Sequence, residues 1–235
     1  MITVVAIDAL EYNLVEDFNM VHLKQTYYGK TNISEFSEPR TIVLWSSFMT
    51  GKNKESEVLA KGDKEMWNIR INLDDTFFTK FKNPCVIDLP GHNYDLEQHK
   101  KERALLQTYF DSDEKEKDKI LKKYNELAFE HHRRVKSKFL DSLNEGYDFL
   151  LGYFSIADVI GHLNFGNRMM MKMIYRELDE IVSQLKGNLI VLSDHGMKAI
   201  GNYGDHSDYG FWSTNFRDIG TPKITDFADI VTSEI

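Results

Sequence analysis

The chain has 235 residues, of which 42% are hydrophobic, and this length is sufficient for a single domain, residues 1–235, with a full core. Its 29 basic and 37 acidic side chains give a formal charge of −8, which excludes the general attraction to phosphate backbones on which most nucleic-acid binders rely. The single cysteine, Cys85, excludes an internal disulfide and a thiolate zinc cluster.

The sequence also lacks the usual signals for membranes and export. No apolar run approaches the roughly 18 to 20 residues that cross a bilayer. The first ten residues, MITVVAIDAL, lack the basic region and the cleavage site of a signal peptide. We therefore expect a cytoplasmic protein that binds neither a membrane nor nucleic acid stably. The oligomeric state is left open.

The first half of the chain contains two expected strands and one expected helix. Residues 1–8, MITVVAID, form a β-branched run too short for a buried helix, so they predict a central strand that ends at Asp8. In residues 38–52, EPRTIVLWSSFMTGK, Pro39 interrupts the preceding segment and an apolar stretch of helical length begins at Thr41. Residues 84–91, PCVIDLPG, predict a second strand bounded by prolines.

The second half continues the alternation of strand and helix. Residues 95–145 are dense in charge and helical in period, and we expect a helical insertion or lid there. Further strands are expected at 148–154, 188–194 and 210–216, and a helix over 170–187 that ends on a glycine. The alternation predicts an α/β fold with a largely parallel sheet flanked by helices.

Polar side chains follow several of these strands at the point where each strand ends. Ligands of parallel α/β sheets bind beyond the carboxyl ends of the strands, so we expect these side chains to converge. The adjacent Asp and His of VLSDHG (191–196) are the hardest to explain by structure alone. Carboxylate and neutral imidazole suit zinc or manganese. The candidate metal ligands are Asp8, Asp158, His162, Asp194, His195 and His206.

Thr41 is a candidate nucleophile. A threonine at a helix N-terminus lies beside backbone N–H groups that have no partner within the helix, and such groups bind anions. An N-terminal threonine is also a common helix cap, so the position alone allows either role.

The ordered motifs resemble the alkaline phosphatase superfamily, most closely its type I phosphodiesterase and nucleotide pyrophosphatase branch. The motifs are an Asp after the first strand, a Thr nine residues before Thr-Gly, then DVIGH, SDHG and GDHSDYG. The resemblance implies a three-layer sandwich and a covalent phosphothreonine formed at Thr41. It implies two divalent metals, with zinc preferred over manganese. One metal would be bound by Asp8, Thr41, Asp194 and His195, the other by Asp158, His162 and His206.

The resemblance leaves the substrate open. It implies a small phosphorylated substrate, and a phosphodiesterase or pyrophosphatase is preferred over the alternatives of a phosphomonoesterase, a phosphomutase or a non-catalytic metal- or phospholigand-binding protein. Ile42 follows the candidate nucleophile, where the family has an aromatic residue that stacks on a base. Candidate substrate contacts are Arg40, Asn68 and His92. The run His131-His132-Arg133-Arg134, within the charged segment, predicts a solvated helix face.

Overall fold

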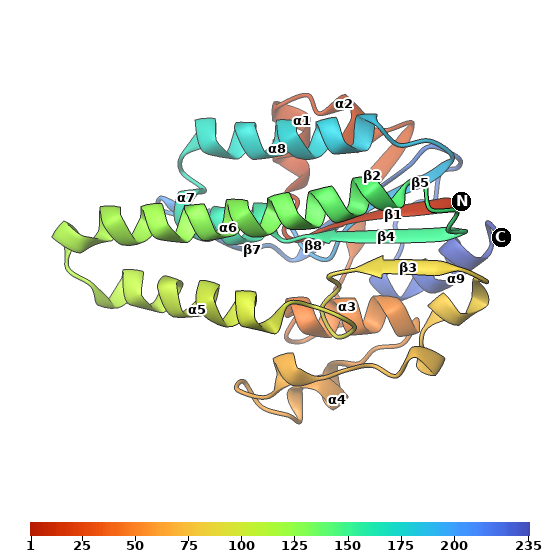
Figure 1. Ribbon diagram of the computed structural model, residues 1–235, viewed down its shortest axis with the longest axis horizontal. Helices are drawn as coiled ribbons and strands as arrows, with labels where there is room; N and C mark the ends of the chain where they lie inside the picture. Colours follow the sequence, from red (N-terminus) through yellow and green to blue (C-terminus); the bar gives the residue numbers. More distant parts are fainter.

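The first strand lies at the centre of a six-stranded sheet in the computed structural model, which describes residues 1–235 (Figure 1). β1 has parallel neighbours on both sides, so all six of its residues are buried, which accounts for its continuous apolar sequence. The strand order is β2-β8-β5-β1-β4-β3. The strands are β1 (Ile2–Ile7), β2 (Tyr27–Asn32), β3 (Pro84–Ile87), β4 (Phe149–Phe154), β5 (Asn188–Ser193) and β8 (Tyr209–Thr214).

Helices cover both faces of the sheet. Alternate residues of β1 belong to two separate cores: Val4 and Ala6 pack on one face, and Val5 and Ile7 on the other. On the first face lie α3 (Thr41–Thr50), α4 (Glu55–Leu59) and α9 (Phe227–Thr232). On the second lie α1 (Tyr12–Asp17), α2 (Val21–Lys24), α6 (Glu114–Ser142), α7 (Ile156–Asn164) and α8 (Arg168–Ser183). This three-layer arrangement confirms the predicted fold class.

Short 3₁₀ turns complete the layer that contains α3. They are η1 (Met66–Asn68), η2 (Leu73–Asp75), η3 (Phe77–Lys80) and η4 (Ile224–Asp226). None of the helices in the structure is both long and apolar enough to cross a membrane.

The sheet differs from the sequence-based prediction at one side. β2 was missed because its sequence, YYGKTN, is polar and its position at the edge leaves it half exposed. β8 is antiparallel to β5, which the local sequence does not indicate. The segment before β8, for which no strand was predicted, is a two-stranded hairpin of β6 (Met197–Ile200) and β7 (Tyr203–His206).

The ends of two helices can be compared with the predicted ones. α3 begins at Thr41 as predicted and ends at Thr50. Gly51 caps it, with a φ of 63° in the left-handed conformation that glycine adopts without strain. α8 ends at Ser183, earlier than expected. Gly187 instead provides the positive φ of 86° in the turn that enters β5.

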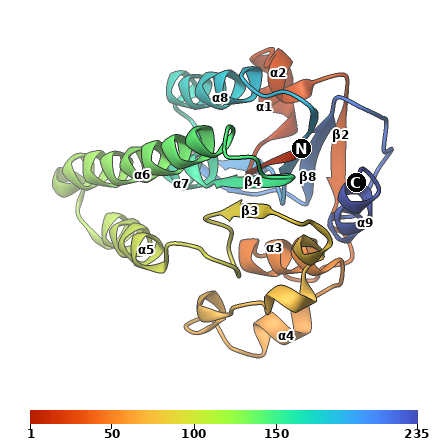
Figure 2. The same ribbon diagram turned by 45° about the vertical axis from the view of Figure 1, so that its right-hand side comes forward.

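Residues 95–145 form α5 (Leu96–Asp111) and α6, an antiparallel pair that projects beyond the sheet (Figure 2). The apolar stripe of α6 packs on the sheet with a three- and four-residue spacing. His131 and His132 lie within this stripe and are buried, so the predicted solvated face was wrong for the two histidines, whereas Arg133 and Arg134 are exposed. The assignment of the segment as an insertion or lid stays a prediction.

Candidate active site

The carboxyl ends of the parallel strands bring the predicted metal ligands together. Asp8 follows β1 directly, and Asp194 and His195 follow β5. Asp158 and His162 lie one turn apart on α7, which follows β4. Because β8 runs antiparallel to β5, it begins at this same edge, and the β6–β7 hairpin that precedes it brings His206 to the site.

One cluster joins Asp8, Asp194, His195 and Thr41. His195 Nε2 lies 3.3 Å from Asp8 Oδ1, 3.4 Å from Asp194 Oδ2 and 3.3 Å from Thr41 Oγ1. All four side chains are almost completely buried. These are the four residues that the resemblance implies for one metal.

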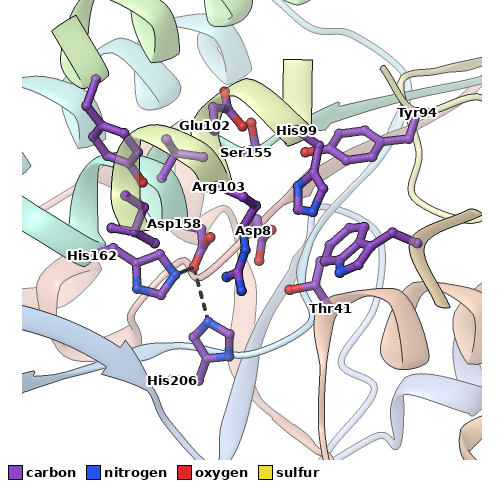
Figure 3. A pocket seen from close by; sticks show the side chains of 14 residues that line it. Asp8, Thr41, Tyr94, His99, Glu102, Arg103, Ser155, Asp158, His162 and His206 are labelled. Carbon is purple, nitrogen blue, oxygen red and sulfur yellow. Dashed lines mark ion pairs between the residues drawn. The ribbon is translucent and has the colours of Figure 1, made fainter. Parts of the chain in front are cut away.

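A second cluster surrounds Asp158. Its Oδ1 lies 3.3 Å from His162 Nε2 and 3.4 Å from His206 Nε2 (Figure 3). The rings of His195 and His206 stack with centroids 3.8 Å apart, so the two clusters are adjacent. Donor atoms of Asp158, His195 and His206 all lie within 4.8 Å of one another, whereas His162 is outside this tighter group.

The donor atoms of both clusters fit divalent metals. Both oxygens of Asp194, Oδ1 of Asp8, Oδ1 of Asp158 and Nε2 of His206 are buried and have no hydrogen-bond partner. A buried carboxylate without a hydrogen-bond partner costs several kcal/mol, and a bound cation would offset this cost. Four ligands at zinc distances in a tetrahedron would lie about 3.3 to 3.6 Å apart, which agrees with the separations around His195.

Neighbouring groups orient these ligands. The hydroxyl of Tyr153 donates to Asp8 Oδ2, which leaves Oδ1 directed at His195. His195 Nδ1 lies 3.1 Å from the carbonyl of Gly196, and His162 Nδ1 lies 3.3 Å from the carbonyl of Gly204. An Nδ1–H that donates to a carbonyl leaves Nε2 free to bind a metal, which is the usual arrangement of metal-binding histidines.

The buried Glu11 holds the hairpin that carries His206. Its carboxylate accepts hydrogen bonds from the Met197 amide at 3.0 Å and from the Tyr209 hydroxyl at 2.6 Å. These bonds tie both ends of the β6–β7 segment to the turn after β1. Glu11 therefore positions His206 next to the strand-end residues.

Burial dominates the electrostatics of the site, because it shifts the pKa values of the carboxyl groups and of His195. Burial raises the pKa of Asp8 well above its usual value, and the charges of Asp194 and Asp158 raise it further. Burial also raises the pKa of Asp194. Burial lowers the pKa of His195 to about 3, so its imidazole is neutral at pH 7 and available as a ligand.

A cavity of about 70 Å³ lies over these clusters. Asp8, Thr41, Asp158 and His206 line it from the sheet edge, and α5 contributes His99, Glu102 and Arg103 (Figure 3). Tyr124 of α6 also lines it. The charged segment 95–145 thus forms one wall of the cavity.

The three predicted substrate contacts lie outside this cavity. Arg40 and Asn68 line an adjoining cavity, where Arg40 forms ion pairs with Glu38 and Asp63. His92 packs edge-on against Phe78, with ring centroids 5.6 Å apart, and lines neither cavity.

Sequence reasoning missed several residues of the site. Tyr153 lies inside a buried strand, and Trp67 lies in a short 3₁₀ turn, and neither position carries a motif. Arg103 is one of many charges on α5. The helical period of α5 shows which of its residues share a face. Its position beside the sheet edge is also needed to tell which face lines the cavity.

The model of the type I phosphodiesterase / nucleotide pyrophosphatase family matches residues 3–212. The chain belongs to this family. The match confirms the resemblance in the sequence motifs and spans every residue of the two clusters. No curated protein matches the chain.

Solved structures of two members are similar to the chain. Murine ectonucleotide pyrophosphatase / phosphodiesterase 5 has 12% sequence identity and a TM-score of 0.47. The human protein of the same name has 14% identity and a TM-score of 0.44. In both cases the match covers 85% of this chain, and the chain spans 58% of the relative's length.

Proposed function

We propose that this family member is a two-metal phosphoryl hydrolase that cleaves phosphodiesters or pyrophosphates through a covalent phosphothreonine. The observation that carries the proposal is the convergence of buried, unpartnered carboxylates and a neutral histidine on Thr41. Membership of the phosphodiesterase family supports the same reaction class.

The residues present can hold two metal ions. Asp8, Asp194, His195 and Thr41 would bind one ion. Asp158, His162 and His206 would bind the other. When bound, two divalent metals, with zinc preferred over manganese, would lower the pKa of the nucleophile and offset the charge of the phosphate.

Thr41 is the nucleophile in this proposal. Its Oγ1 forms a bond to phosphorus as the bond to the leaving oxygen breaks, which gives phosphothreonine. Water then attacks the same phosphorus and releases the phosphorylated product and the free Thr41 hydroxyl. The burial of Thr41 keeps bulk water away from the first step.

The start of α3 supplies hydrogen-bond donors for the transferred group. No side chain caps this helix end. The backbone N–H groups of its first turn, at Thr41, Ile42 and Val43, therefore remain available beside the nucleophile. In this position they would stabilise negative charge on the non-bridging oxygens in the transition state.

A hydrolysis assay tests this proposal. We would load the protein with zinc or manganese and compare bis-p-nitrophenyl phosphate with p-nitrophenyl phosphate. Thr41→Ala should lower kcat by about 10³-fold or more, because the nucleophile is lost. Thr41→Ser keeps the hydroxyl and should retain far more activity than Thr41→Ala.

Each outcome bears on the proposal. Diester preference that depends on Thr41 supports it, and monoester preference would point to a phosphatase or mutase instead. Full activity in Thr41→Ala would exclude the covalent mechanism. Two bound metals without turnover of either ester would favour the non-catalytic binding protein.

A further inference from the structure

A second cavity adjoins the cavity over Thr41 and is much larger. Its volume is about 390 Å³, compared with about 70 Å³ for the cavity over Thr41. The smaller cavity is too small for a whole organic ester, whereas the larger one falls in the usual range for small-molecule sites. The two share three lining residues, Trp67, His99 and Arg103, so they lie side by side.

The larger cavity is basic, although the protein carries a charge of −8. Four cationic side chains and one carboxylate, Asp63, line it. Two of the cations are already neutralised: Arg40 pairs with Glu38 and Asp63, and Lys100 pairs with Glu97 at 2.8 Å. The other two, Lys64 and Arg103, have no carboxylate within ion-pair distance.

Arg103 is placed to serve both cavities. Its side chain extends from α5 into the cavity that Asp158 and Thr41 also line (Figure 3). The neighbouring Glu102 cannot neutralise it, because the Glu102 carboxylate accepts from Gln98 at 2.7 Å and lies 3.7 Å from His131 Nδ1. An unpaired guanidinium in such a position is suited to phosphate oxygens.

The wall beside Arg103 is formed by stacked rings. The rings of Trp67 and His99 lie with centroids 3.9 Å apart and an interplanar angle of 31°. Burial and the Arg103 charge lower the pKa of His99 to about 4, so this ring adds no charge at pH 7. Arg103 and Lys64 are therefore the free cations of this wall.

We infer that Arg103, with Lys64, selects substrates that carry a second anionic group next to the phosphate cleaved at Thr41. The chemical class is a phosphoanhydride or an ester whose attached group bears a phosphate or carboxylate. This inference rests on the proposed hydrolase function, and it adds a specificity-determining role for α5.

Binding and kinetics of two diesters test the inference. Bis-p-nitrophenyl phosphate carries one negative charge, and bis-p-nitrophenyl pyrophosphate carries two. We would measure kcat/KM in the metal-loaded protein, and Kd by calorimetry in the Thr41→Ala background, which separates binding from chemistry. The variants are Arg103→Gln, Lys64→Gln and, as a matched control, Lys101→Gln, an exposed position of α5 that lines neither cavity.

Arg103→Gln should reduce the preference for the doubly charged diester by about 10- to 100-fold, which corresponds to one lost charge-assisted hydrogen bond or pair. Lys64→Gln should reduce it less, and Lys101→Gln should leave it within twofold. An unchanged preference in Arg103→Gln, or equal losses for both diesters, would overturn the inference. If the wild type hydrolyses neither diester but an Arg103-dependent preference remains in Kd, the hydrolase proposal fails and the anion selectivity stands.

Discussion

At the residue scale, the decisive feature is the concentration of acids where water cannot reach them. Asp194 is fully buried, and neither of its oxygens has a hydrogen-bond partner. Burial raises the pKa of Asp194, and the nearby negative charge of Asp158 raises it further. Such a residue destabilises the metal-free protein, and a bound cation would offset this cost.

We therefore predict opposite effects of Asp194→Asn on metal binding and on the metal-free fold. The variant should lose bound metal and activity, since one ligand is removed. Without metal it should be at least as stable as the wild type, because a buried charge has been removed. Elemental analysis and thermal unfolding in a chelator would measure the two effects.

The control for this change is Asp205→Asn. Asp205 lies exposed next to the metal-site hairpin residue His206 and is 4.0 Å from Lys198. The same chemical change at this position should leave the metal content unaltered. A metal-free Asp194→Asn protein that unfolds well below the metal-free wild type would show that Asp194 has a structural role independent of metal.

At the element scale, a buried ion pair between His131 and Asp88 links α6 to the end of β3. His131 Nε2 lies 2.7 Å from Asp88 Oδ2, and its Nδ1 faces Glu102 of α5 at 3.7 Å. Burial lowers the pKa of His131, but the hydrogen bonds and charges of Asp88 and Glu102 outweigh burial and raise it to about 9. One charged imidazole thus links β3, α5 and α6.

This pair predicts a loss of stability at alkaline pH. The folded pKa of His131 is above its unfolded value of about 6.5, so its contribution is fully present below pH 6.5 and is lost as the pH rises through 9. The loss should be on the order of 3 kcal/mol. Urea unfolding of wild type and His131→Gln between pH 6 and 10 would measure it.

The difference between the two proteins isolates the contribution of His131, because other histidines titrate equally in both. The stability gap should be wide at pH 6 and should narrow towards pH 10. A gap that stays constant over this range would mean that His131 is neutral in the folded protein.

At the scale of the whole molecule, the candidate metal centre joins elements that are distant in the chain. Its donors come from the ends of β1, β5 and β7 and from α3 and α7. A ligand that binds only the folded state stabilises it according to its concentration relative to Kd. Metal should therefore stabilise the entire fold, and not only the loops that bind it.

Removal of metal by a chelator should lower Tm by about 10 °C. This value assumes zinc at roughly 1,000 times its Kd, which gives about 4 kcal/mol, and about 2 to 4 °C per kcal/mol for a chain of this size. Differential scanning fluorimetry with zinc titrated back would test it. An equal Tm with and without metal would indicate that the clusters do not bind zinc.

The fold class, the start of α3 at Thr41 and the family could all be predicted from the order of the residues. Each depends on a local pattern: a buried strand that ends in an acid, a proline before an apolar helix, and the short motifs DVIGH and SDHG. Such patterns can be recognised in the sequence because the side-chain periodicity of a helix or strand depends on only a few neighbouring residues.

The path by which distant segments reach the site could be seen only in the folded chain. The sequence motifs name His206, but it reaches the site through a hairpin and an antiparallel β8 that the sequence does not indicate, and Arg103 reaches it because α5 packs along α6 beside the sheet edge. The burial of His131 follows from the docking of α6 on the sheet. These placements depend on contacts between residues far apart in the chain, and charge and periodicity within a segment do not specify such contacts.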